Sequence, residues 1–360
     1  MNIVLLDLNF EAVAIVDMYQ SFIWTDRFNE AGDFEFYSKA SLENFNLFKQ
    51  GYYLKMDSSE HLMIIEGIEI ISDLDDGNKI RVIGRSLESL LDRRIIWEQT
   101  NVTGSIESVI KKLISDAILT PKIPERKIDN FIFQDSTDKR LAEITIEDSQ
   151  FTGDNLYDVV CKLCQEYRVG FKIVLDEHKN FVFSLYLGTD RTNDQTDVIA
   201  VIFSKNFDNI IDSSYVSNYI TYKNITLVAG EGEGKARKTA IVGDEVSKGI
   251  DRRELFTDAR DISSNTDNGT IPAATYTKLL KKRGQMELLE NDITLEFDGQ
   301  VDTDGLFRYG VDFFLGDLVH FYDEYGNGSK VRVDEMIFSW DSNGKSAYPS
   351  FVILNENKET

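Results

Sequence analysis

The sequence predicts a mostly β protein of the α+β class, with two small antiparallel β-barrel domains and inserted α+β domains. Two observations point to this fold. A strand-and-turn pattern at residues 51–84 returns at residues 316–354, and segments with helical periodicity lie between these two regions. A chain of 360 residues also exceeds what one hydrophobic core usually serves, so we expect several domains.

The repeated pattern is an extended run, a polar turn, two more extended runs, a tight turn and a final strand. In residues 51–84 the tight turn reads Asp-Asp-Gly-Asn, and in residues 316–354 turns are expected at Asn327-Gly328 and Asn343-Gly344. Asn-Gly and Asp-Gly supply the positive φ that hairpin turns need, and β-branched or aromatic residues flank them. The identity between the copies is low, so duplication and a chance likeness both stay open.

Residues 1–100 are expected to form the first barrel domain. The apolar N-terminus is interrupted by Asp7, Glu11 and Asp17 and reads as a strand pair, not as a signal peptide. An alternating FEFY strand follows a turn at residues 30–33. A short helix over residues 86–92 ends at Arg93 and Arg94, whose charges suit the carbonyl end of a helix.

Residues 101–204 are expected to form an inserted α+β domain. Thr103 or Ser105 caps a helix that reaches residue 118, and a strand covers residues 131–134. A second helix begins near Asp154, and a hairpin covers residues 171–188. Residues 205–235 would then open the second barrel, 236–291 form a loop-rich segment with a helix over 272–289, and 292–360 complete the barrel, beginning with a strand pair at 292–301.

The second helix contains Cys161 and Cys164, the only cysteines of the chain. A zinc site would need two more ligands, and the three histidines are scattered along the sequence at positions 61, 178 and 320. We therefore expect both cysteines to be reduced, half-buried helix residues that bind no metal.

The formal charge of −23 opposes specific binding to phosphate backbones. An acidic surface would also suit a duct that passes DNA without holding it, and a merely soluble acidic protein stays equally open. No run approaches the roughly 18 apolar residues of a membrane span, so we expect a soluble protein without one.

No motif indicates catalysis or a cofactor. The Gly-rich stretch at residues 230–235 lacks the spacing and the hydroxyl residue of a phosphate loop, and its two glutamates would repel phosphate. The acidic turns at 73–77 and 302–305 fail the EF-hand pattern, although adventitious calcium stays open. Histidines are too few for a convincing triad or two-histidine metal motif, so we expect a protein that is not an enzyme.

Paired arginines are the one basic theme of this acidic chain. They are Arg93, Arg94, Arg252 and Arg253, joined by Arg260. Helix-end capping and surface ion pairs explain them, at about 0 to 1 kcal/mol each. A subunit or domain interface explains them equally well, because arginine binds a neighbour's carboxylates in bidentate geometry.

Four phrases in order give the chain a family resemblance: AGDFEFY; IIEGIEIISDLDDGNKIRVIGRSLESLLDRRII; VAGEGEGKARKTAIVG with GIDRRELFTDARDI; and RYGVDFFLGDLVHFYDEYGNG. Together they resemble the siphovirus tail hub family, which includes the N-terminal structural part of tail-associated proteins. The resemblance covers nearly the whole chain. The phrases are not catalytic motifs, so they imply a fold and an assembly role, not an active site.

The resemblance implies a baseplate-hub fold with two tail-tube-like barrels, assembled as a homotrimer. Six barrels in a ring would match a sixfold tail tube to a threefold tip and leave an acidic channel for DNA passage. The implied partners are the distal tail protein and the tape measure protein, and the implied location is the virion tail tip of a phage or prophage, after assembly in the host cytoplasm. Some relatives carry a peptidase or carbohydrate-binding region after the hub, whereas this sequence stops at Thr360.

Two other functions stay open at this point. The first is a tail-associated cell-wall hydrolase or glycan-binding tail protein. The second is a soluble adaptor of unrelated origin that is built from barrel domains.

Overall fold

The computed structural model describes residues 2–73, 77–207, 209–266, 269–301, 306–322, 328–341 and 344–354. The chain forms two compact units. Unit 1 contains Met1–Ser89, Val169–Tyr215 and Glu296–Thr360, and unit 2 contains Leu90–Arg168 and Val216–Leu295. The expected turn residues at 75, 76, 327 and 343 and the acidic stretch 302–305 lie outside the described residues. The finer division at residues 100, 204, 235 and 291 stays a prediction.

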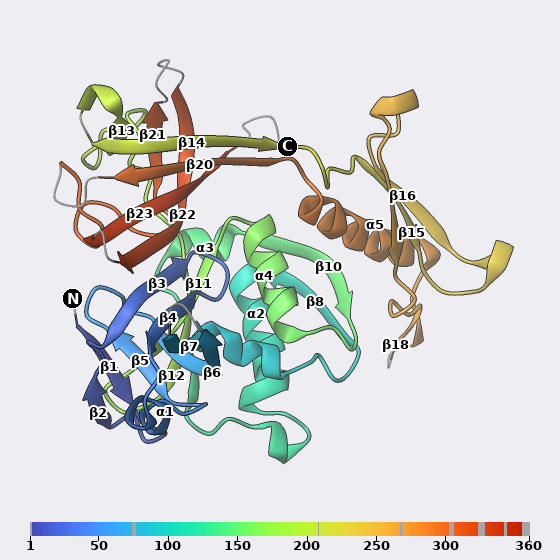
Figure 1. Cartoon of the computed structure of the whole chain (residues 1–360). Helices are drawn as coiled ribbons and strands as arrows, with labels where there is room; N and C mark the ends of the chain where they lie inside the picture. Colours follow the sequence, from blue (N-terminus) through green and yellow to red (C-terminus); the bar gives the residue numbers. More distant parts are fainter. Residues whose placement is uncertain are drawn as a thin grey trace. The chain divides into compact units, whose positions relative to one another are not determined.

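Unit 1 is built on one sheet of 13 strands (Figure 1). Its order is β14-β20-β23-β22-β3-β4-β7-β6-β5-β1-β2, with β21 paired to both β22 and β13. The strands are β1 (Ile3–Leu6), β2 (Ala12–Ile15), β3 (Tyr19–Arg27), β4 (Asp33–Lys39), β5 (Tyr53–Met56), β6 (Leu62–Asp73), β7 (Gly77–Ser86), β13 (Ile202–Ser204), β14 (Ile210–Asn218), β20 (Thr294–Val301), β21 (Leu318–Tyr322), β22 (Gly328–Asp341) and β23 (Gly344–Ile353). The unit also contains α1 (Leu42–Leu47) and the hairpin β11 (Gly170–Leu175) and β12 (Phe181–Tyr186).

Alternation along the strands makes one face of this sheet apolar and the other charged. Phe34 and Phe36 of β4 are buried in the core, whereas Glu35 between them is partly exposed and binds Arg81 of β7 at 2.6 Å. Stacked aromatic rings, such as Phe34 on Phe36 with centroids 6.1 Å apart, fill the core. The expected N-terminal strand pair and the FEFY strand are both confirmed.

The two halves of this sheet share one order of strands. In the first half β3, β4, β7, β6 and β5 lie side by side, and in the second half β14, β20, β23, β22 and β21 do. Segment 51–84 supplies β5, β6 and β7, and segment 316–354 supplies β21, β22 and β23, each as an antiparallel meander. The repeated order expected from the sequence is therefore confirmed.

The likeness extends to single hydrogen bonds. The backbone N–H of Gly51 donates to the carbonyl of Ile65, and the N–H of Gly316 donates to that of Val333, both at 2.8 Å. Gly51 has a φ of 85° and Gly316 a φ of 86°, a left-handed conformation that favours glycine. In both halves the long strand has an irregularity directly after this contact, between Ile65 and Gly67 and between Val333 and Glu335. These shared details favour duplication over a chance likeness.

The two halves do not close into separate barrels among the described strands. Instead β22 of the second half pairs with β3 of the first, from Glu335↔Arg27 to Trp340↔Phe22. Hairpin turns and strand alternation in the sequence indicate meanders, but they do not fix which strand forms the next neighbour, because that pairing joins residues about 300 positions apart. The structure therefore shows one shared sheet, and the two separate barrels predicted from the sequence are not confirmed.

Unit 2 combines helices with smaller sheets. Its strands are β8 (Thr100–Ser105), β9 (Phe131–Gln134), β10 (Thr145–Phe151), β15 (Ile225–Ala229), β16 (Thr239–Gly243), β17 (Glu254–Asp258), β18 (Asn265–Thr266) and β19 (Gly269–Thr270), and its helices are α2 (Ile106–Ile114), α3 (Lys139–Glu143), α4 (Leu156–Glu166) and α5 (Ala273–Glu290). Short helical turns cover Leu87–Arg93, Ser115–Leu119, Pro124–Arg126, Lys205–Phe207, Gly234–Ala236 and Gly249–Asp251 along the chain. A three-stranded sheet has the order β16-β15-β17, and β8 pairs with β10.

Helix α5 packs against one face of the three-stranded sheet (Figure 1). Tyr276 and Leu280 of the helix form a buried cluster with Val228 of β15. Gly284 permits the close approach, because a Cβ there would lie 2.6 Å from a methyl carbon of Val228. The opposite face of this sheet is not covered by α5.

Several expected elements are confirmed and others need correction. The side chain of Ser105 caps α2, β9 covers Phe131–Gln134 as expected, and α5 follows Pro272. Residues 236–268 were expected to be loop-rich, but they contain the strands β16 and β17. Both strands are short and lie among polar and glycine residues, so their alternation is hard to recognise in the sequence. Residues 292–301 form one strand, not a pair, because the partner of β20 is β23. The expected strand run after residue 205 divides between two sheets, with β14 in one and β15 in the other.

A buried charge cluster fixes β11 to the main sheet of unit 1. Nδ1 of His61 lies 3.0 Å from Oε1 of Glu88, which also accepts a 2.8 Å hydrogen bond from the backbone of Ile173. Asp26 is buried nearby and accepts from the indole of Trp24 at 2.7 Å. Burial opposes the charge of His61, but Glu88 and Asp26 outweigh it and raise the pKa of His61 to about 9.

This cluster predicts that unit 1 loses stability in mild alkali. The folded pKa of His61 lies above its unfolded value, so its stabilisation is complete below about pH 6.5 and is lost as the pH rises through about 9. Between pH 6.5 and 8.5 we expect the free energy of unfolding to fall by about 2 to 3 kcal/mol. Urea unfolding at several pH values measures this loss.

The matched variants are His61→Gln and His178→Gln, because His178 is exposed. His61→Gln should remove most of the pH dependence in this window, and His178→Gln should leave it unchanged. Equal slopes in both variants would show that His61 does not carry the effect.

Candidate functional site

The described residues contain no group of three or more His, Cys, Asp or Glu side chains placed to hold a metal ion. Cys161 and Cys164 form no disulfide, and burial raises the pKa of the Cys164 thiol well above its ordinary value. No helix in the described part of the chain is long and apolar enough to cross a membrane.

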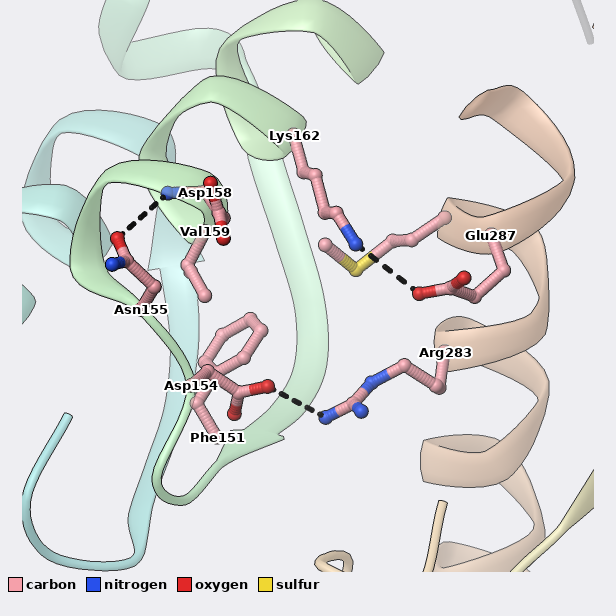
Figure 2. A pocket seen from close by; sticks show the side chains of 9 residues that line it. Phe151, Asp154, Asn155, Asp158, Val159, Lys162, Arg283 and Glu287 are labelled. Atoms are coloured by element: carbon pink, nitrogen blue, oxygen red, sulfur yellow. Dashed lines mark hydrogen bonds and ion pairs between the residues drawn. The ribbon is translucent and has the colours of Figure 1, made fainter. Parts of the chain in front are cut away.

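A small pocket lies between α4 and α5 of unit 2, and its charged side chains are largely paired with one another (Figure 2). Nζ of Lys162 lies 3.2 Å from Glu287, and Nη2 of Arg283 lies 2.8 Å from Asp261 and 3.7 Å from Asp154. Burial acts against the charge of Lys162, but its glutamate contacts raise its pKa. Figure 2 shows Lys162 of α4 paired with Glu287 of α5, and Arg283 of α5 paired with Asp154 just before α4, which is the geometry of a helix contact.

The Gly-rich stretch at residues 230–235 is held by its own carboxylate. Glu231 accepts hydrogen bonds from the backbone and the hydroxyl of Ser264 at 2.6 and 2.7 Å, and an ion pair from Lys238 at 3.1 Å. Although partial burial acts in the opposite direction, these contacts lower the pKa of Glu231 to about 2. A fixed negative charge in this loop agrees with the expectation that it is not a phosphate cradle.

The outward face of the three-stranded sheet in unit 2 carries an exposed apolar row. Leu227 of β15 pairs in register with Ile241 on one side and with Phe256 on the other. All three are exposed, Phe256 by 58%, whereas Val228 on the opposite face is fully buried against α5. We name Leu227, Ile241 and Phe256 the apolar row. An exposed aromatic and aliphatic row of this kind is typical of a contact surface.

Two of the arginines expected at an interface lie beside the apolar row. Arg252 binds Glu254, which precedes Phe256 by two residues on the same strand face, at 2.7 Å. Arg260 forms a two-pronged pair with Asp258, which follows Phe256 by two residues, at 2.6 and 3.0 Å. These contacts lower the pKa of Asp258 to about 2. Ion pairs therefore border the row at both ends of β17. In many protein interfaces a polar rim of this kind surrounds the central apolar residues.

The other three predicted arginines have different surroundings. Arg253 donates to the backbone carbonyl of Tyr219 at 2.8 Å, and its guanidinium lies 5.8 Å from the ring centre of Tyr222. Arg93 and Arg94 lie at the end of a short 3-10 helix. No hydrogen bond or ion pair between described residues joins Arg93 or Arg94 to Arg252, Arg253 or Arg260.

Sequence reasoning missed the apolar row. Leu227 lies in residues 205–235, which were expected to be strands of the second barrel, whereas Ile241 and Phe256 lie in residues 236–291, which were expected to be loop-rich and helical. Nothing in the sequence pattern placed the three residues together. The alternation in Glu254–Asp258 is a signal that could have indicated a half-exposed strand. The register that aligns the three residues is a property of the sheet.

Comparison with family models decides the relationship. Residues 2–351 match the model described as Siphovirus ReqiPepy6 Gp37-like protein. The chain belongs to this siphovirus Gp37-like family. The resemblance to siphovirus tail proteins that the ordered phrases indicated is thereby confirmed. A comparison with curated protein sequences gives no match.

Several solved structures similar to this Gp37-like chain are tail proteins. A 43 kDa tail protein of prophage MuSo2 from Shewanella oneidensis aligns at 15% identity with a TM-score of 0.54, over 98% of each chain. A tail protein from Neisseria meningitidis MC58 aligns at 14% and 0.54, over 98% of this chain and 96% of that one. Prophage tail protein gp18 from Listeria monocytogenes EGD-e aligns at 12% and 0.50, over 100% and 96%. At these identities the likeness shows a shared tail-protein fold.

The two faces of β15 in the Gp37-like chain allow a direct test. Leu227→Thr should change the free energy of unfolding by less than about 0.5 kcal/mol, because the side chain faces solvent and threonine suits a strand. Val228→Thr should cost about 1 to 3 kcal/mol, because it buries a hydroxyl against α5. Thermal or urea unfolding of the two variants measures the difference. Equal costs would contradict the assignment of an uncovered outward face.

Proposed function

We propose that this chain is a structural hub protein of a phage or prophage tail tip or baseplate. Three copies form a ring that adapts a sixfold tail tube to a threefold tip and surrounds an acidic channel for DNA. The family match and the tail-protein fold support a tail role. The observation that carries the ring is the repeated strand order within unit 1, because two similar halves in each of three chains make six similar parts.

The joint between the halves suggests how copies join. Within one chain, β22 uses its first residues to pair with β21 and its later residues to pair with β3. Among the described residues, the equivalent strand β6 pairs with β5 from Leu62 to Ile64 and with β7 alone from Gly67 onward. The counterpart of β3 is β14, which is the terminal strand of the described sheet. We infer that β6 of one copy pairs with β14 of the next, as β22 pairs with β3.

Burial of the equivalent side chains supports this joint. Counting from the strand irregularity, Ile70 of β6 takes the place of Phe338 of β22. Phe338 is 5% exposed, and the next inward residue, Trp340, packs its ring 5.3 Å from that of Phe22 across the joint. Ile70 is 54% exposed. A neighbouring copy would cover Ile70 and would turn an open strand edge into a paired one.

Passage of DNA needs a lumen that does not hold phosphates. The net charge of −23 favours repulsion. On the charged face of the first half, Arg81 is held by Glu35 and Glu69, and Arg85 by Glu66 at 2.8 Å. Guanidinium groups neutralised in this way give phosphates little to bind. The channel, and the distal tail and tape measure proteins as neighbours in the virion tip, are part of the proposal.

The ring predicts that a charge at β6 prevents assembly. Ile70→Lys should leave unit 1 folded, because the side chain is exposed, and should lower the assembly state, because a lysine at this edge opposes strand pairing. Ile15→Lys is the matched control, since Ile15 of β2 is 62% exposed on another strand. Sedimentation and electron microscopy of the wild type should give a trimer with a six-lobed ring.

Several outcomes would contradict the ring. A wild-type protein that stays monomeric at all concentrations would contradict the ring. An Ile70→Lys variant that assembles like the wild type would also contradict it. A zymogram with peptidoglycan separates the alternative function, because clearing would indicate a cell-wall hydrolase.

We also propose that Arg252, Arg253 and Arg260 lie at a subunit or domain contact together with the apolar row. Arg252→Glu with Arg253→Glu should weaken assembly, more at low salt, where like-charge repulsion is screened less. Lys139→Glu with Arg140→Glu is the control of equal charge change, because Lys139 and Arg140 belong to the separate helix α3. Sedimentation at low and high ionic strength measures the effect. An unchanged oligomer at both would count against an interface role.

A further inference from the structure

Three arginines and a tryptophan gather on unit 2, and the arginines have no carboxylate partner among the residues that the structure describes. Nε of Arg94 donates to the backbone carbonyl of Arg126 at 3.0 Å, and Nη1 of Arg94 donates to that of Arg93 at 2.9 Å. Nη2 of Arg126 donates to the carbonyl of Ile95 at 2.6 Å, and its guanidinium lies 5.4 Å from the ring centre of Trp97. We name Arg93, Arg94, Trp97 and Arg126 the arginine–tryptophan patch.

The patch leaves its positive charge uncompensated. In the described part of the chain, no ion pair joins Arg93, Arg94 or Arg126 to an acidic side chain. Partial burial and the charges of Arg126 and Arg93 lower the pKa of Arg94, as expected where cations are crowded together. Such crowding is unusual in a chain with 62 acidic and 39 basic residues.

The acidic residues beside the patch in the sequence form no ion pair with its arginines among the described residues, and Asp92 accepts a 2.8 Å hydrogen bond from Asn155. Glu98 pairs with Lys122, and Asp129 pairs with Lys127 at 2.9 Å. Glu125 lies next to Arg126 in the same helical turn, but it is exposed and forms no ion pair with Arg126 among the described residues. Most guanidinium donors of the patch therefore stay available, since each arginine has five N–H groups and Arg94, the most engaged, uses two.

Apolar surface accompanies the charge. Trp97 is 58% exposed, and Ile95 and Ile123 are also exposed. Tryptophan and arginine are the residue types that most often dominate protein interfaces. A single-stranded nucleic acid would also use both kinds of surface, because its bases stack on tryptophan, but it carries a phosphate charge on every nucleotide, which the net charge of −23 repels. A short polypeptide segment with a few carboxylates and an apolar side chain fits both the arginines and Trp97.

We propose that the arginine–tryptophan patch is a docking site for an acidic polypeptide segment of a partner protein that carries an apolar side chain beside its carboxylates. The carboxylates form two-pronged bonds with the arginines, and the apolar side chain packs against Trp97. Charge complementarity decides against a second copy held by the same patch, because like patches would repel. This inference does not depend on the trimeric ring.

The test uses the full chain and a synthetic blocked peptide, Asp-Phe-Glu-Asp-Phe-Glu. Trp97 is a natural reporter, because the other two tryptophans, Trp24 and Trp340, are buried. We expect the peptide to protect Trp97 fluorescence from iodide quenching and to bind several-fold more weakly at about 300 mM than at about 50 mM salt. Arg93→Glu should raise the dissociation constant at least about fivefold.

Arg93 suits this substitution because its side chain donates no hydrogen bond within the described residues, so the fold should persist. Arg126→Gln is a second variant and should also weaken binding. Arg140→Glu is the control, since Arg140 is exposed on α3 and its reversal changes the net charge equally. Its dissociation constant should equal that of the wild type.

Four results would overturn the proposal. The first is no protection of Trp97 at millimolar peptide. The second is equal binding of a peptide with serine in place of phenylalanine. The third is equal or tighter binding of a thymidine hexanucleotide, which would indicate a phosphate ligand. The fourth is loss of the oligomer in Arg93→Glu, which would indicate that a second copy covers the patch.

Discussion

The pairing of β22 with β3 is the contact on which the architecture of unit 1 depends. It joins Glu335 to Arg27 and Trp340 to Phe22, residues more than 300 positions apart, into one antiparallel ladder. Nε of Arg27 lies 2.6 Å from Glu335, and the rings of Trp340 and Phe22 complete the apolar side of the joint. Without this ladder the two meanders would each present an open edge, and their aromatic residues would be exposed to water.

The repeated halves make the joint more than a local contact. The later residues of β22 in the second half pair with β3, the first strand in the order of the other half. Because different surfaces of two similar halves meet, the contact is head to tail. A head-to-tail contact between similar parts leaves one unused surface of each kind, and here these are the later residues of β6 and the edge of β14. Such surfaces either close into a ring or continue into a filament. Closure would give a finite assembly, as the proposed hub requires.

Charge is distributed differently in the two units. On the main sheet of unit 1, Arg81 and Arg85 form ion pairs with glutamates of neighbouring strands, so these two guanidinium groups are neutralised. In unit 2 the arginines of the arginine–tryptophan patch form no ion pair with any described residue, and the apolar row is not covered by α5. Exposed apolar side chains and crowded like charges are unfavourable in an isolated chain, so we interpret the patch and the apolar row as surfaces that partners cover. In the proposed assembly, the sheet of unit 1 builds the ring, the apolar row of unit 2 lies at a subunit or domain contact, and the arginine–tryptophan patch binds another protein.

The sequence by itself determined the local elements and the family. Alternation predicted the strand at Asp33–Lys39, a serine cap and a 3.6-residue period predicted α2, and the ordered phrases indicated the siphovirus tail relationship. The sequence also singled out all five arginines. It could not separate Arg93 and Arg94, which form no ion pair with described residues, from Arg252 and Arg260, which pair with Glu254 and Asp258. Only the tertiary structure decided that two meanders share one sheet, and that Leu227, Ile241 and Phe256 form one row. The physical reason is that alternation fixes which face of a strand is apolar, whereas strand neighbours and register are fixed by long-range packing.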